Sequence, residues 1–263
     1  MGGGSVQKKI SVSAIVGKRE GGGKVNEYEY KYEDKCWFNG SCYIQKTKGC
    51  NRFCALRREF DYLLFASEVP EKFKSYDKLV LHPEDEDVET FITLNDIKSD
   101  IDTFVEEGRF LYIWGKTAGS GKSSWSIKIM LTYLAMKSLG NGFNPNVAFF
   151  VYVPNFLFKA KNFENKEERQ EVIDKALNVD LLILDDLSAT QVSNYDSSVL
   201  SDVIDARYRE NKATIFTSNL SPSELSASCG ERTADRVLSD IALEIKGAGH
   251  RESTNTYRRK NVK

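Results

Sequence analysis

The sequence has little of several features that mark other classes of protein. Its 263 residues include only two histidines, His82 and His250, and neither lies near a nucleophile-like motif, which argues against general hydrolase chemistry. No apolar run approaches the length of a membrane span, and the N-terminus lacks the apolar core of a secretion signal. We therefore expect a cytoplasmic protein without a membrane partner. A net charge of -1 gives no global basic field, so any nucleic-acid contact must come from local patches.

A phosphate-binding loop is the most informative feature that is present. The apolar run 110–114 leads directly into GKTAGSGKSS at 115–124, and the segment 123–139 looks helical. Glycines let backbone N–H groups close on phosphate oxygens, Lys122 can reach the β- and γ-phosphates, and the Ser123 hydroxyl can bind Mg²⁺. The phosphates would also lie at a helix N-terminus. The predicted ATP-binding residues are Gly119, Ser120, Gly121, Lys122, Ser123 and Ser124.

The first position of this loop departs from the usual pattern. A Walker A loop reads G-x-x-x-x-G-K-[ST], and counting back from Gly121 places Lys116 where the first glycine belongs. Gly115 stands one residue too early. The loop therefore contains either an inserted residue or a substituted glycine. The alternative is a glycine-rich turn without a ligand.

An acidic strand provides the expected second half of the site. The segment 180–186 reads DLLILDD, and its run of aliphatic residues suits a strand covered on both faces of a parallel sheet. Asp185 would hold Mg²⁺ through water, and Asp186 would polarise the attacking water. Many strands end at a turn that contains Asp, so this pattern alone is weak evidence. It indicates a magnesium site because it follows a phosphate loop.

Three polar residues further along the chain are candidates for the same chemistry. Asn219 follows the predicted strand 213–217 and can orient a water near the γ-phosphate. Arg236 lies on a late helix, from which it can reach a neighbouring subunit's nucleotide, and Arg251 follows the last strand. Taken alone, Asn219 is typical of a turn, and the two arginines are typical of a surface.

Strands and helices alternate through most of the chain. This order predicts an α/β fold with a parallel five-stranded sheet and helices on both faces. The predicted strands are 110–114, 146–153, 180–186, 213–217 and 241–245. The predicted helices are 94–107, 123–139, 166–177, 193–209 and one from Ser221, where Ser221, Pro222 and Glu224 form a capping box.

Four of the five cysteines are clustered, which indicates a metal site. Their clustering and the lack of a secretion signal favour structural Zn²⁺ over disulfides, although the spacing is not the common paired C-x2-C. An iron–sulfur cluster or free thiols are the alternatives. Nearby basic and aromatic residues can contact single-stranded nucleic acid, although a small aromatic core explains them more simply. The predicted metal ligands are Cys36, Cys42, Cys50 and Cys54, whereas Cys229 is expected to be a small buried residue.

The chain is thus predicted to have four parts. They are a flexible lead-in over 1–24, a cysteine-rich zinc-binding domain over 25–80, an acidic linker over 81–92 and an ATPase domain over 93–263.

The order of motifs resembles the AAA+ family of replicative helicase loaders, DnaC and DnaI, and especially their phage-encoded relatives. The matching segments are GKTAGSGKSS, DLLILDDL, IDARYRENKATIFTSNLSP and ADRVL. The resemblance implies an AAA+ P-loop core without a C-terminal lid, preceded by a helicase-contacting module. It also implies Walker A roles for Lys122 and Ser123, Walker B roles for Asp185 and Asp186, sensor 1 for Asn219, the arginine finger for Arg236 and sensor 2 for Arg251.

The function implied by this resemblance is ATP-switched loading of a hexameric replicative helicase onto single-stranded DNA. The protein would self-associate through its ATPase domain, hydrolyse ATP slowly with stimulation by its partner, and act in the bacterial host cytoplasm if phage-encoded. One alternative is an IstB-type transposition helper ATPase, and another is a phage inhibitor that captures the helicase without loading it. The sequence leaves open the oligomer size, the helicase partner, the choice between zinc and iron–sulfur, and which arginine is the finger.

Overall fold

A parallel five-stranded sheet forms the centre of the protein in the computed structural model, as the alternation of elements predicted. The structure describes residues 36–38, 42, 54–74, 87–138, 143–162, 166–187 and 194–247, all of which belong to one compact unit, Tyr32–Lys263. The strand order is β2-β3-β4-β1-β5, and every neighbouring pair is parallel. The strands are β1 (Phe110–Trp114), β2 (Ala148–Tyr152), β3 (Leu181–Asp185), β4 (Thr214–Ser218) and β5 (Ile241–Glu244).

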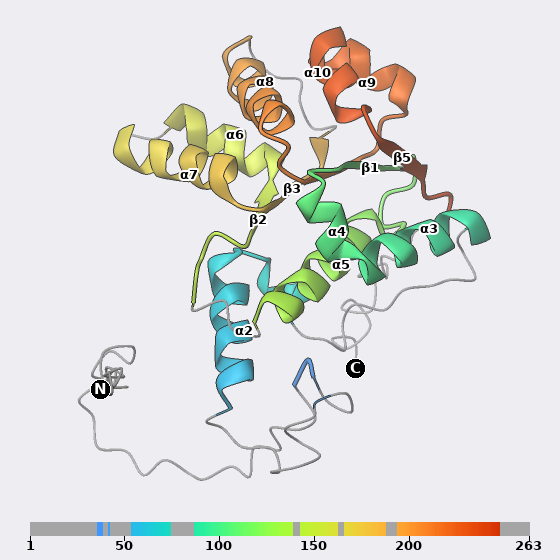
Figure 1. Cartoon of the computed structure of the whole chain (residues 1–263). Helices are drawn as coiled ribbons and strands as arrows, with labels where there is room; N and C mark the ends of the chain where they lie inside the picture. Colours follow the sequence, from blue (N-terminus) through green and yellow to red (C-terminus); the bar gives the residue numbers. More distant parts are fainter. Residues whose placement is uncertain are drawn as a thin grey trace, which may run out of the picture. The chain divides into compact units, whose positions relative to one another are not determined.

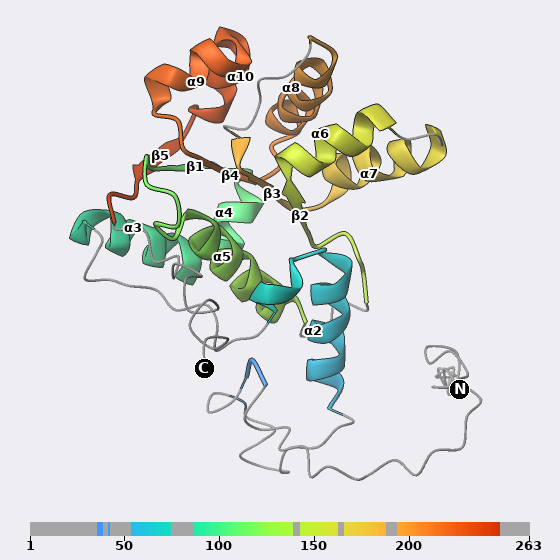
Figure 2. The same ribbon diagram turned by 180° about the vertical axis from the view of Figure 1, so that it is seen from behind.

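Helices cover both faces of this sheet (Figures 1 and 2). One face carries α2 (Ala55–Ala66), α3 (Val88–Ser99), α4 (Ile101–Glu106) and α5 (Lys122–Lys137). The other face carries α6 (Val153–Asn162), α7 (Lys166–Asn178), α8 (Asn194–Arg209), α9 (Pro222–Cys229) and α10 (Glu231–Val237). None of the helices in the described ranges is long and apolar enough to cross a membrane.

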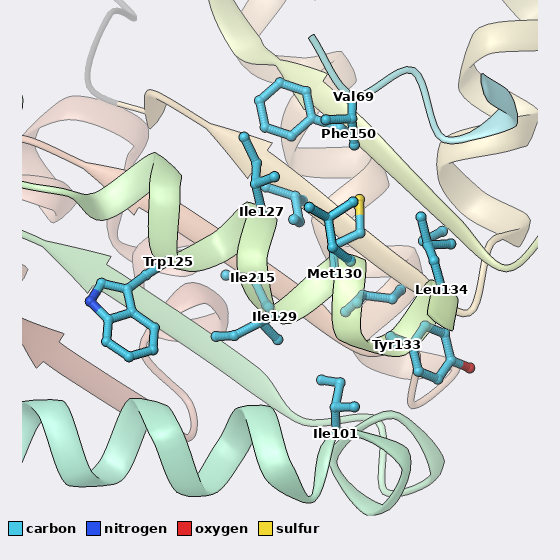
Figure 3. Packing of buried hydrophobic residues seen from close by; sticks show 14 of the residues in the cluster. Val69, Ile101, Trp125, Ile127, Ile129, Met130, Tyr133, Leu134, Phe150 and Ile215 are labelled. Carbon is cyan, nitrogen blue, oxygen red and sulfur yellow. The ribbon is translucent and has the colours of Figure 1, made fainter. Parts of the chain in front are cut away.

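The helix that follows the phosphate loop, α5, is the central helix of its layer. It is apolar around most of its circumference, which is typical of a helix buried on all sides. Trp125, Ile127 and Met130 are fully buried, and Figure 3 shows them pointing in different directions from α5. Residues of the sheet, such as Ile215, and of α4, such as Ile101, complete this core. The packing fixes the start of α5, and therefore the phosphate loop, against the sheet.

The helix predicted over 94–107 is instead two helices, α3 and α4, so that prediction was wrong. Helix α3 begins at Val88 because the Asp87 carboxylate caps it, accepting a 3.0 Å hydrogen bond from the Glu89 N–H. The two helices separate at Asp100, whose φ of -114° and ψ of 37° are not helical. Apolar periodicity missed the first turn because Val88 is 70% exposed. The last residues of the predicted linker 81–92 are therefore helical.

Two helices, α2 and α6, were not predicted from the sequence. Helix α2 lies within the predicted cysteine-rich domain, yet its Phe60, Leu63 and Leu64 belong to the same buried cluster as α5 and the sheet. Trp37 stacks on the Phe60 ring with centroids 5.7 Å apart, and Phe38 meets that ring edge-on. Trp37 and Phe38 therefore pack on α2 and on the same core as the sheet.

The zinc site is not seen among the described residues. Cys36, Cys42 and Cys54 are half-buried. Across the described ranges, no three Cys, His, Asp or Glu side chains gather in a way that could hold a metal ion. Cys50, the fourth predicted ligand, lies outside the described residues. The zinc site therefore stays a prediction from spacing, and elemental analysis of the purified protein tests it.

Arg207, in the segment IDARYR, is a fully buried charge that joins three elements. Its guanidinium donates hydrogen bonds to the carbonyls of Ala176 (2.9 Å), Val179 (2.8 Å) and Ala213 (2.6 Å), and to the Thr214 hydroxyl (2.9 Å). These acceptors lie at the end of α7 and at the starts of β3 and β4. Burial lowers the pKa of Arg207, while the carbonyl dipoles offset the cost of burying its charge. Arg207 thus has a structural role.

Candidate nucleotide-binding site

A cavity of about 750 Å³ lies at the carboxyl ends of β1, β3 and β4. In open parallel sheets, ligands bind at this edge. Because β4 separates β1 from β3, the residue that follows β4 lies between the phosphate loop and the acidic strand. The cavity brings together nine of the predicted site residues: Gly119, Ser120, Gly121, Lys122, Ser123, Ser124, Asp185, Asp186 and Asn219.

The phosphate loop has the backbone conformation that its glycines allow. Gly119 has a φ of 82° and Gly121 a φ of 101°, in the left-handed region that other residues avoid. Lys122 is buried, and its ammonium donates to the carbonyls of Gly115 and Thr117, each at 2.9 Å. The loop carbonyls therefore hold the Lys122 ammonium inside the loop, where a motif of this kind binds phosphate.

Gly115 is needed for packing rather than for contact with phosphate. Its N–H bonds the Ser218 carbonyl at 3.3 Å, and a Cβ at this position would lie 2.2 Å from the Ile245 carbonyl oxygen. Gly115 therefore continues the β1 backbone between its two neighbouring strands. Lys116 occupies the first position of the loop and forms an exposed ion pair with Glu224, at the start of α9. We interpret the departure from the motif as a substitution, not an insertion.

A threonine that was not predicted from the sequence joins the two aspartates. The register that pairs Leu184 with Phe216 brings Asp185 beside Thr217 of β4. The Thr217 hydroxyl donates to Asp185 Oδ1 at 2.7 Å and accepts from the Asp186 N–H at 3.0 Å. Both Asp185 and Thr217 are buried. The sequence did contain a hint of this contact, because a hydroxyl residue near the end of a predicted buried strand needs a polar partner.

Asp186 has an unusual backbone conformation. Its φ of 63° is in the left-handed region, which is uncommon for residues other than glycine and most often adopted by Asn or Asp. The Tyr152 hydroxyl contacts its Oδ2 at 3.4 Å. Such strained positions cluster at functional sites. This conformation turns Asp186 out of the strand direction while Asp185 stays buried.

The site combines carboxylates with a hydroxyl in a partly buried setting. Burial raises the pKa of Asp185, while hydrogen bonds from Thr217 and Ser123 and the nearby Lys72 oppose the rise, and Asp186 adds to it. A bound cation would favour the ionised carboxylate. The hydroxyl of Ser123 and the carboxylate of Asp185 are oxygen ligands of the kind that Mg²⁺ prefers, and they already contact each other. The residues present therefore fit Mg²⁺ and a triphosphate.

Neither of the two predicted arginines is among the described residues that line the cavity. Arg236, on α10, does not line the cavity; its guanidinium stacks on the Tyr208 ring at 4.6 Å and lies 3.6 Å from an Asp205 carboxylate oxygen. The Arg236 Nε is buried without a hydrogen-bond partner. Within one chain, Arg236 is therefore separate from the phosphate loop. Arg251 lies outside the described residues, and its role stays a prediction.

Comparison with known families agrees with this geometry. Residues 94–260 match the family described as IstB-like ATP binding protein, which covers well over half of the chain. The chain belongs to this family. The match includes the phosphate loop, the acidic strand, Asn219 and α10, but it begins after α2 and the segment that follows it.

Individual relatives confirm the resemblance to helicase loaders. The chain is 29% identical over 120 residues to the replicative helicase loader DnaI of Bacillus subtilis (strain 168), covering 45% of this chain and 36% of DnaI. It is also 29% identical over 76 residues to the replicative helicase loader DnaC of Buchnera aphidicola subsp. Baizongia pistaciae (strain Bp), covering 29% of this chain and 31% of DnaC. The chain thus spans about a third of the length of these relatives.

Solved structures show the same fold. A DnaI crystal structure superposes with a TM-score of 0.51 at 22% identity, covering 70% of this chain and 95% of that one. A crystal structure of the DnaC helicase loader gives a TM-score of 0.50 at 22% identity, covering 60% and 89%. Domain III of DnaA from Thermotoga maritima gives 0.52 at 16% identity, covering 64% and 65%. The chain therefore shares the fold of these three proteins.

Proposed function

We propose that this chain is an ATP-dependent loader of a hexameric replicative helicase onto single-stranded DNA. The observation that carries the proposal is the cavity in which Lys122, Asp185 and Asn219 meet, in a family of ATP-binding proteins. Two relatives that the chain matches are named as replicative helicase loaders.

The proposed chemistry assigns a role to each residue in the cavity. Lys122 leaves the loop carbonyls and binds the β- and γ-phosphates, while Ser123 and Asp185 hold the cation. Bound Mg²⁺ neutralises charge on the phosphates. Asp186 polarises the attacking water, and Asn219 orients it. Hydrolysis in this proposal is slow until a partner completes the site.

The partner in hydrolysis is proposed to be a second copy of the chain. Arg236 does not reach the cavity of its own chain, so any contact with nucleotide has to be made in another protomer. In its own chain the Arg236 guanidinium is positioned outside the cavity by the Tyr208 ring and by ion pairs with Asp205 and Asp235. ATP would thus stabilise an oligomer on single-stranded DNA, and the cysteine-rich segment would bind the helicase.

A loading assay tests this proposal. The protein is mixed with its cognate replicative helicase, circular single-stranded DNA and ATP, and helicase transferred to the DNA is measured by sedimentation and by unwinding of an annealed strand. We expect transfer with the wild type and none with Lys122→Ala. A stable complex with the helicase that blocks unwinding would identify an inhibitor and refute the loader.

A second candidate is a transposition helper ATPase, which the name of the matched family favours. Such a protein would assemble on duplex DNA in the presence of ATP. Electron microscopy and gel shifts with duplex and single-stranded DNA separate the two. ATP-dependent assembly on duplex DNA, without binding to the helicase, would replace the loader by this candidate.

A further inference from the structure

A segment from outside the family match forms part of the wall of the nucleotide cavity. Residues 69–74, here called the strap, follow α2 and include the short helix η2 (Glu71–Phe73). Pro70, Lys72 and Phe73 line the cavity together with the phosphate loop. The family match begins only at residue 94, so the strap is not one of the nucleotide-binding motifs of the family.

The strap is firmly attached to the edge of the sheet. The carbonyl of Ser67, just before the strap, accepts the Phe150 N–H of β2 at 2.8 Å. Val69 is 2% exposed and lies beside Phe150 (Figure 3). Lys175 of α7 donates to the Ala66 carbonyl at 2.7 Å. These contacts fix the point at which the strap enters the cavity.

The strap brings a second positive charge to the acidic end of the cavity. Of the described residues that line it, Lys72 and Lys122 are the cations. The ammonium of Lys72 lies 4.5 Å from the centroid of the Phe73 ring. Asp185 and Asp186 also line the cavity, and the charge of Lys72 lowers the pKa of Asp185. This end of the cavity is where the cation and the terminal phosphate would lie in the proposed function.

We propose that Lys72 binds the terminal phosphate of the bound triphosphate and so distinguishes ATP from ADP. Lys72 is an exposed residue, and a lysine side chain has enough reach and freedom to turn from the Phe73 ring to a phosphate. A triphosphate places more negative charge at this end of the cavity than a diphosphate does. The strap follows α2, and α2 begins directly after Cys54. A γ-phosphate held by Lys72 would therefore contact the part of the chain that connects the cavity to the cysteine-rich segment.

The inference rests on the proposed nucleotide binding, and calorimetry on the full chain tests both. Binding of Mg·AMPPNP and Mg·ADP is measured for the wild type, Lys72→Met, Lys72→Arg and Lys74→Met. Lys74 is the matched control, because it belongs to the strap and pairs with Glu71 at 2.9 Å but does not line the cavity.

We expect Lys72→Met to weaken AMPPNP binding by about tenfold, which corresponds to about 1.4 kcal/mol, and ADP binding by less than about twofold. Lys72→Arg should keep most of the preference for the triphosphate, and Lys74→Met should change neither affinity. If Lys72 only balances the carboxylates, Lys72→Met will change both affinities alike, and the inference is wrong. If the wild type binds neither nucleotide, the proposed function fails together with it.

Discussion

The hydrogen bond between Thr217 and Asp185 gives the sharpest test of the candidate site. Thr217→Val keeps the shape of the side chain and removes the hydroxyl that donates to Asp185 at 2.7 Å. The same change leaves the Asp186 N–H, 3.0 Å away, without its acceptor. Thr217 is 2% exposed and Asp185 8% exposed, so water replaces the lost contact poorly.

The expected size of the effect follows from these contacts. A hydrogen bond to a charged group contributes about 1.5–3 kcal/mol, and a buried N–H without a partner costs about 1–3 kcal/mol. A loss of about 1.4 kcal/mol in the transition state lowers a rate tenfold. We therefore expect Thr217→Val to reduce the ATPase kcat at least about tenfold and to lower the free energy of unfolding by about 1–3 kcal/mol. Thr217→Ser, which keeps the hydroxyl, should remain within about threefold of the wild type.

The pH profile provides an independent readout. Burial raises the pKa of Asp185, and the Thr217 hydrogen bond opposes that rise. Cation binding requires the ionised carboxylate, so activity is lost as the pH falls through this pKa. Removing the hydroxyl raises the pKa further, and the acid limb of the Thr217→Val profile should move to higher pH. Steady-state ATPase assays across pH and Mg²⁺ concentration measure both effects. Identical kcat values and profiles for the Val and Ser variants would refute the reasoning.

Other predictions concern the frame of the site and its neighbours. Arg207→Met should lower the free energy of unfolding by about 3–5 kcal/mol in urea titrations, because buried carbonyls lose their donor; exposed Arg209→Met, the control, should change it by less than about 0.5 kcal/mol. An equal effect of both would show that the buried contacts are unimportant. Gly115→Ala should abolish nucleotide binding in a filter assay, because its Cβ would overlap the Ile245 carbonyl; unaltered binding would contradict the packing role. Arg236→Ala should leave ATP binding intact and remove the rise of specific ATPase activity with protein concentration, and persistence of that rise would place the finger elsewhere.

Local sequence patterns determined the elements that form the site. The apolar run before a glycine-rich loop predicted β1 and α5, the aliphatic run before two aspartates predicted β3, and Ser221 with Glu224 predicted the start of α9. In the structure the Ser221 N–H donates to the Glu224 carboxylate at 2.8 Å, as a capping box requires. These signals depend on periodicity and turn chemistry within a few residues, so they can be read without knowing the rest of the chain.

Tertiary structure alone decided which side chains meet. Strand order places β4 between β1 and β3, which brings Thr217 to Asp185 and Asn219 into the cavity. The side chain of Arg207 reaches the ends of elements that lie up to 31 residues away, so its sequence neighbours gave no sign of its burial. Lys72 lies on a segment that precedes the ATPase motifs, and contacts with β2 and α7 position that segment. These contacts depend on packing between segments that are far apart in the sequence, so a local sequence pattern cannot predict them.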